Sequence, residues 1–133
     1  MSYTLALARC VDQTAFESQG NCFAACVATV LGLRLEDVPA FEHPIVQVRD
    51  LSRWLADKGL ALVCARAGSG YMGECLHMRL GSGPRGRRHA VVYYGGSLVH
   101  DPHPSRAGLL EGEPQTALFF VPIDVGVHDG ARG

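Results

Sequence analysis

The order of helix-like and strand-like segments is the feature that most constrains how this chain folds. Apolar residues at three- and four-residue steps predict a buried helix over 22–31 and a second, amphipathic helix that ends at Gly59. The second helix is marked by Val48, Leu51, Trp54 and Leu55. Five runs typical of strands follow, at 60–65, 74–80, 89–94, 97–100 and 117–123. Helices that precede a series of strands predict an α+β domain with a mostly antiparallel sheet.

Turn-forming residues fix the expected ends of these segments. Asn21 is the expected N-cap of the first helix, and Gly32 its stop signal. The Gly95-Gly96 pair predicts a two-residue hairpin between the third and fourth of the five runs. Residues 33–41 predict a turn with a short helical piece, residues 3–8 a short strand and residues 12–19 an ordered loop.

Length and charge restrict the classes of protein to consider. The 133 residues suit about one domain, which we place at residues 1–123, with 124–133 as a frayed tail. Twelve basic and 13 acidic residues leave a net charge of -1, so nothing indicates a nucleic-acid partner. The longest uncharged stretch, 20–33, is too short to span a bilayer. We therefore expect a cytoplasmic protein, or one exported by a route that its own sequence does not encode.

The five cysteines are an odd number in a chain without a signal peptide, so at least one thiol should be free. Cys22 stands where a loop enters the buried helix. Unpaired amide groups and the helix dipole at that position favour the thiolate, which is the reactive form of cysteine. The alternative is that Cys22 is a small core residue like its helix neighbours.

His89 and Asp101 are the residues that could assist such a thiol. His89 opens a strand after the glycine- and arginine-rich loop 81–88, where an imidazole can take up the thiol proton and later release it. Asp101 lies twelve residues further on, across the predicted hairpin, so regular pairing would bring its carboxylate alongside the imidazole. The alternatives are a polar residue with ordinary hydrogen bonds for His89 and a turn-forming Asp-Pro for Asp101.

These three motifs together carry a resemblance to a known family. Gly-x-Cys at 20–22, His-Ala-Val-Val at 89–92 and Val-His-Asp-Pro at 99–102 resemble papain-like cysteine peptidases, specifically the bacteriocin-leader peptidase group and its stand-alone relatives. The resemblance covers about residues 13–123 and implies a papain-like α+β fold, with the helices packed on the sheet. It also implies that Cys22 is the nucleophile, His89 the general base and acid, and Asp101 the orienting residue, with no cofactor.

The resemblance further implies a glutamine that helps to bind the oxyanion. Gln13 is favoured over Gln19, because Gln19 is so close to Cys22 that its side chain would have to fold back sharply. The predicted substrate contacts are Asn21, Phe23 and Arg88. Phe23 stands where many relatives have glycine and would narrow the space beside the thiol.

The expected activity is hydrolysis of a peptide or related amide bond through an acyl-enzyme, with a peptide or protein as substrate. Two alternatives stay open: deamidation or transamidation of a protein glutamine by the same triad, and a binding module without turnover. The arginines at 85, 87 and 88 belong to a solvated loop or hold a substrate carboxylate.

A metal site is the remaining alternative for these residues. Cys22 and Cys26 have i, i+4 spacing, and His100 and His103 could add imidazoles. Cys26 is better explained as a core residue of a helix that is apolar nearly all round, so we predict no metal. Cys64, in an apolar strand, is predicted to be structural.

Overall fold

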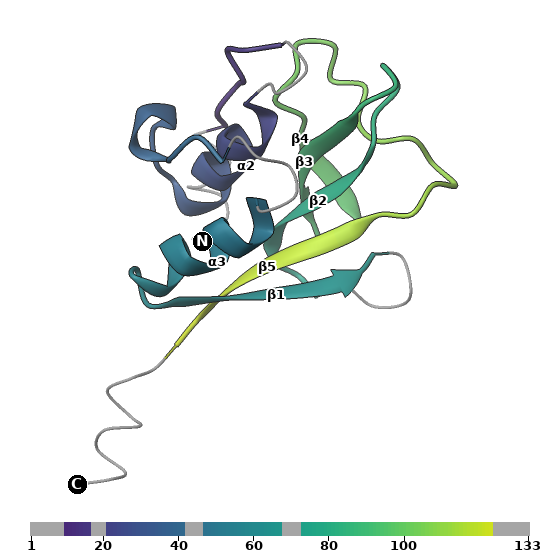
Figure 1. Cartoon of the computed structure of the whole chain (residues 1–133). Helices are drawn as coiled ribbons and strands as arrows, with labels where there is room; N and C mark the ends of the chain where they lie inside the picture. The colour runs from purple at the N-terminus through teal and green to yellow at the C-terminus, as the bar shows by residue number, and fades with distance from the viewer. Residues whose placement is uncertain (1–9, 17–20, 42–46, 68–72, 124–133) are drawn as a thin grey trace, which may run out of the picture.

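The computed structural model describes residues 10–16, 21–41, 47–67 and 73–123. Two helices pack on one face of a five-stranded sheet (Figure 1), so the α+β class predicted from the sequence is confirmed. The strand predicted at 3–8, the tail at 124–133 and part of the loop predicted at 12–19 lie outside the described residues.

Helix α2 (Cys22–Leu31) is buried along most of its length, as the sequence predicts. It ends at Gly32, which has a φ of 72° and donates its amide to carbonyls of the last turn. Asn21 is the N-cap residue, but its side chain does not cap the helix. The amide oxygen instead accepts hydrogen bonds from the backbone N–H groups of Thr14 and Ala15, at 2.9 and 3.0 Å. Asn21 therefore fastens the preceding loop to the start of the helix.

The second helix is shorter than predicted. A 3-10 turn, η1 (Leu35–Asp37), comes first, and α3 (Gln47–Ala56) buries Leu51 and Leu55 against the core. Trp54 lies edge-to-face on Phe41 at 5.9 Å between ring centroids. The helix ends three residues before Gly59, because the chain there already follows a turn stabilised by backbone hydrogen bonds.

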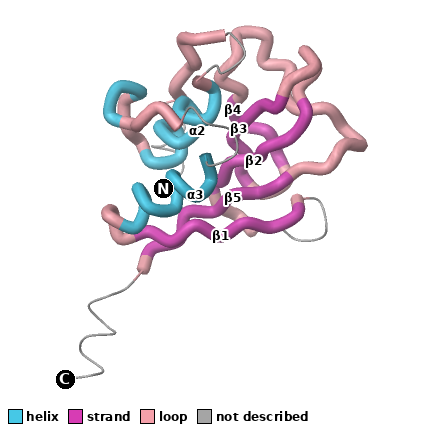
Figure 2. The backbone as a smooth tube through the Cα atoms, viewed as in Figure 1, coloured by secondary structure: helices cyan, strands magenta, loops and turns pink. Residues whose placement is uncertain are grey.

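All strand pairs of the sheet are antiparallel within the described chain, in the order β1-β5-β2-β3-β4 (Figure 2). The strands are β1 (Leu60–Arg66), β2 (Leu76–Ser82), β3 (Arg88–Tyr94), β4 (Ser97–His100) and β5 (Thr116–Pro122). Strands β2 and β3 both extend into the predicted loop 81–88, so their connection is reduced to residues 83–87. The arginine-rich loop is therefore a short connection between two paired strands.

Alternate residues of the central strands face the helices and form the core. Met78, Val92 and Leu118 are fully buried there and pack with Val27 of α2 and Leu55 of α3. Burial of each such side chain stabilises the fold by roughly 1.5–3 kcal/mol. The core therefore fixes α2 over β2 and β3, where Cys22 begins the helix close to the start of β3.

The opposite face of the sheet carries a buried polar cluster that the sequence analysis did not predict. His77 is fully buried, stacks on Phe119 at 4.6 Å, and accepts a hydrogen bond from Arg79 Nε at 3.3 Å. The Arg79 guanidinium lies 3.9 Å from the ring centroid of Tyr93. Burial, together with the nearby Arg79, lowers the pKa of His77, so this ring is neutral at pH 7.

A bilayer-spanning helix, long and apolar throughout, is not found in the part of the chain that the structure describes.

Candidate active site

A β-bulge in the β3–β4 hairpin sets the position of Asp101. Tyr93 pairs with Leu98, but Val92 pairs with His100, so Val99 is an additional residue on β4. The sequence predicted the hairpin at Gly95-Gly96 correctly but predicted regular pairing. The bulge changes the strand direction at the point where β4 ends, one residue before Asp101.

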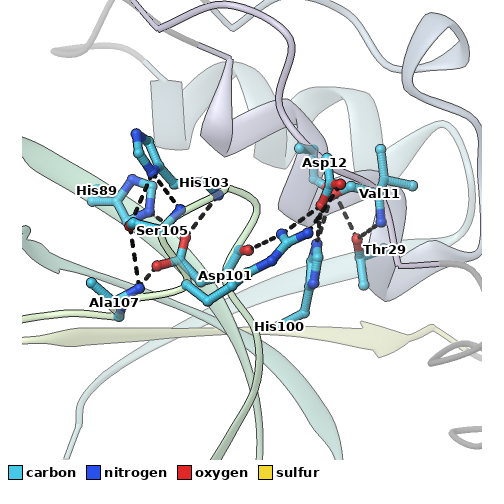
Figure 3. A network of polar contacts seen from close by, with 12 residues as sticks. Val11, Asp12, Thr29, His89, His100, Asp101, His103, Ser105 and Ala107 are labelled. Carbon is cyan, nitrogen blue, oxygen red and sulfur yellow. Dashed lines mark hydrogen bonds and ion pairs between the residues drawn. The ribbon is translucent and has the colours of Figure 1, made fainter.

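His89 and Asp101 form a buried pair beside the end of this hairpin (Figure 3). His89 Nε2 lies 2.7 Å from Asp101 Oδ1, and the two side chains are 5% and 0% exposed. The carboxylate also accepts the backbone N–H of His103 at 2.9 Å and that of Gly108 at 2.7 Å. Burial alone would raise the pKa of Asp101, but these hydrogen bonds outweigh it and lower the pKa to about 2. Asp101 is therefore a fixed negative charge at neutral pH.

Cys22 approaches the same imidazole from the start of α2. Its thiol lines the same cavity as His89 and is one of the groups that raise the pKa of the imidazole. Asp101 occupies Nε2, so Nδ1 is the ring nitrogen left for the thiol. Burial alone would lower the pKa of His89, but the hydrogen bonds to Asp101 and Cys22 raise it to about 9. The imidazole is thus protonated at neutral pH and can donate a proton to a leaving group.

The thiol and imidazole lie on the wall of a cavity of about 590 Å³. Of the three predicted substrate contacts, Phe23 and Arg88 line this cavity. Asn21 is not among the lining residues, because its side chain is bound to Thr14 and Ala15. Phe23 is buried and packs edge-to-face on Phe41 at 5.6 Å between ring centroids. It is therefore a fixed part of the cavity wall.

Gln13, the predicted oxyanion donor, lines the same cavity and is 7% exposed. Its backbone N–H donates to Pro102 O at 3.1 Å, and its side-chain Nε2 donates to Ala15 O at 2.9 Å. One N–H of the side-chain amide is left for a ligand. The side-chain Oε1 is buried without a hydrogen-bond partner in the described structure. Gln19 lies outside the described residues.

A second polar network holds the Gln13 segment against the loop that follows Asp101, and sequence reasoning missed it. Arg106 donates to both carboxylate oxygens of Asp12 and to the backbone carbonyl of Asp101 (Figure 3). His100 Nε2 lies 2.8 Å from Val11 O and 3.4 Å from Asp12 Oδ1. Arg106, which makes these hydrogen bonds, has a backbone φ of 53°, an unusual value for a residue other than glycine. Segments 90 residues apart are thereby fixed around one site.

The other four cysteines differ from Cys22 in their surroundings. Cys26 is fully buried, and burial, with smaller effects of Cys22 and Asp101, raises its pKa well above the usual range. Cys64 was predicted to be structural, but it is exposed and lines the cavity, in the half of β1 whose residues are exposed. Cys10 and Cys75 are exposed.

The alternative metal site is not formed. Within the described ranges, no three His, Cys, Asp or Glu side chains are grouped as metal ligands. His100 is directed to Val11 and Asp12, and His103 to Ser105.

Comparisons of the chain with protein-family models, with curated proteins and with solved structures gave no match.

Proposed function

We propose that this protein is a papain-like cysteine hydrolase that cleaves a peptide or related amide bond through an acyl-enzyme. The observation that carries the proposal is the arrangement of three side chains. A thiol at a helix start contacts an imidazole, and a buried carboxylate holds the other ring nitrogen at 2.7 Å. The arrangement opens on a cavity large enough for a peptide segment.

In the acylation step, the Cys22 sulfur attacks the carbonyl carbon and the carbonyl electron pair moves to oxygen. The backbone N–H of Cys22, at the helix start, and the side-chain amide of Gln13 stabilise the oxyanion. His89 then gives its proton to the leaving nitrogen as the C–N bond breaks. The product is a thioester on Cys22 and a free amine.

In the deacylation step, water attacks the thioester carbonyl and His89 accepts a proton from it. The C–S bond breaks, the acid leaves, and Cys22 returns to its starting state. Asp101 stays ionised throughout and keeps the imidazole in the orientation that both proton transfers require.

A peptide-library screen of the wild type, Cys22→Ala and Cys75→Ala tests the proposal. Cys75 is an exposed thiol that does not line the cavity, so Cys75→Ala is the matched control. We expect new amino termini with the wild type and the control, and none with Cys22→Ala. Release of ammonia without chain cleavage would assign the same triad to glutamine deamidation. A Cys22→Ala protein with the wild-type rate, after contaminating peptidase is excluded, would refute the proposal.

A further inference from the structure

The rim of the cavity beside Cys22 and His89 is positively charged. Arg85, Arg87 and Arg88 all line it, together with His103. No aspartate or glutamate is among the lining residues in the described part of the chain. Three guanidinium groups on one side of a concave site focus a positive field into it.

Two of these arginines are held in place by neutral partners. Arg87 Nη1 donates to Phe16 O at 2.8 Å, across the cavity mouth, and Arg85 Nη1 donates to Ser105 Oγ at 3.1 Å. A guanidinium has five N–H donors, so most of them stay available in each case. Arg88 precedes His89 directly, and its side chain makes no hydrogen bond or ion pair with the rest of the described structure.

His103 adds a neutral donor to the same rim. Its Nδ1 accepts the backbone N–H of Ser105 at 3.0 Å, so Nε2 carries the proton. The ring lies edge-to-face on His89 at 6.3 Å between ring centroids (Figure 3). It lies in the same way on Phe16, at 5.5 Å. Burial and the nearby Arg85 lower the pKa of His103, which keeps this ring uncharged at pH 7.

Two acids close to the site are already paired with other groups of the chain. Asp101 lies behind His89 with a fully buried side chain and accepts three hydrogen bonds. Asp12 is paired with Arg106 through both oxygens. Within the described structure, the three rim arginines are therefore not neutralised by the chain itself, and an anionic ligand would relieve their mutual repulsion.

We infer that the substrate carries a carboxylate close to the scissile bond, which Arg88 and Arg85 bind at the cavity rim. This inference rests on the proposed hydrolase activity and names its substrate class. A planar guanidinium pairs with a carboxylate through two parallel hydrogen bonds, which fixes orientation as well as charge. The carboxylate can be the C-terminus of a peptide or the side chain of an Asp or Glu.

Alkylation of Cys22 with iodoacetate and iodoacetamide measures this preference without a known substrate. In both reactions the thiolate sulfur bonds to the methylene carbon and iodide leaves, but only iodoacetate carries a carboxylate. The quantity to compare is the iodoacetate-to-iodoacetamide rate ratio at Cys22, read by mass spectrometry in the native protein and in the same chain denatured in urea.

We expect the native ratio to exceed the denatured ratio by about tenfold, as for charge steering into a cleft, and to fall as salt is added. Arg88→Gln should lower the native ratio, and Arg85→Gln with Arg88→Gln should bring it near the denatured value. Arg34→Gln is the matched control, because Arg34 is the exposed residue that precedes η1 and does not line the cavity. Equal native and denatured ratios, or a ratio unaffected by Arg88→Gln, would overturn the inference.

A binding measurement on Cys22→Ala separates this inference from the proposed function, because it needs no reactive thiol. Four tripeptides with acetylated N-termini are titrated into the Cys22→Ala protein while the backbone amide NMR signals of residues 85–89 are followed. The two peptides of the first pair differ only in the central residue, which is Glu in one and Gln in the other. The two peptides of the second pair differ only at the C-terminus, which is free in one and amidated in the other. We expect shifts with the carboxylate member of at least one pair, and that pair identifies the source. No shift with any carboxylate peptide would refute the substrate class, even if Cys22 proves to be a catalytic nucleophile.

Discussion

At the scale of single residues, His89 is the group whose chemistry the surroundings change most. Asp101, which lies against Nε2, and Cys22 raise its pKa to about 9 against the effect of burial. A histidine that is charged at neutral pH can supply the proton that a leaving amine needs. His89 loses this positive charge as the pH rises through about 9.

Asp101→Asn should therefore shift the titration of His89 to lower pH. The substitution removes the carboxylate charge that favours the imidazolium, and an amide leaves the ring free to adopt the other tautomer. Measured by NMR of the His89 ring, the wild type should be half-titrated near pH 9 and the variant closer to the ordinary value of about 6.5. Identical midpoints in the two proteins would show that Asp101 does not set this pKa.

Gln13→Ala tests the oxyanion donor apart from the nucleophile. Loss of one such donor lowers kcat by about 10²–10³-fold in well-studied acyl-transfer enzymes. Alkylation of Cys22 by iodoacetamide forms no oxyanion, so its rate should stay within about twofold of the wild type. If both rates fall equally, Gln13 acts by holding the loop at Ala15 rather than by binding the oxyanion.

At the scale of secondary structure, Cys22 and Cys26 occupy successive turns of α2 with opposite environments. Cys22 lines the cavity, whereas Cys26 is fully buried between the helix and the sheet. Cys22→Ala should leave the melting temperature within a few degrees of the wild type. Cys26→Asp should destabilise by several kcal/mol, because it places an unpaired charge in the core.

Thermal unfolding of both variants, with Cys26→Ala as an uncharged control, measures this difference. Cys26→Ala should cost less than Cys26→Asp, since it removes only the sulfur atom from a packed position. A Cys22→Ala protein destabilised as much as Cys26→Asp would place Cys22 in the core and not in a site.

The elements that local sequence determines were predictable, and those that depend on long-range contacts were not. Apolar spacing located α2, and Gly32 and Gly95-Gly96 located its end and the hairpin. The side-chain role of Asn21 was predicted wrongly, because a distant loop at 14–15 competes for its amide oxygen. The hairpin predicted from the sequence placed Asp101 near His89, but no local sequence feature indicated the bulge at Val99.

Other parts of the site lacked any sequence signal of this kind. The Asp12–Arg106 pair joins residues 94 apart, and neither residue belongs to a periodic pattern. The apolar residues of β1 predicted a buried strand, but the residues from Val63 to Arg66 are exposed, Cys64 among them. The alternation of His77 and Arg79 with apolar residues in β2 was the one available sign of the buried cluster on the reverse face.

At the scale of the whole molecule, the shifted pKa values link stability to pH. The pKa of His89 is higher in the folded protein than the ordinary 6.5, so its contribution is fully present below pH 6.5 and is lost as the pH rises through about 9. The pKa of Asp101 is lowered to about 2, so its contribution is present above its ordinary pKa and is lost as the pH falls through about 2. Stability from this pair is therefore greatest between about pH 4 and 6.5.

Urea unfolding at pH 6 and pH 9.5 tests this linkage. Between pH 6 and pH 9.5, the free energy of unfolding of the wild type should fall by up to about 3 kcal/mol more than that of His89→Asn, because the asparagine side chain does not titrate. Equal losses in the two proteins would show that His89 does not hold its proton more tightly in the folded state.

The most direct test of the central claim is the alkylation rate of each of the five cysteines in the native protein near neutral pH. We predict that Cys22 reacts with iodoacetamide faster than Cys10, Cys64 and Cys75, although all three are more exposed, and that Cys26 does not react. His89→Ala should slow Cys22 and leave the other rates unchanged. Equal labelling of the exposed thiols and Cys22, or a Cys22 rate that does not depend on His89, would contradict the claim that these residues form a catalytic pair.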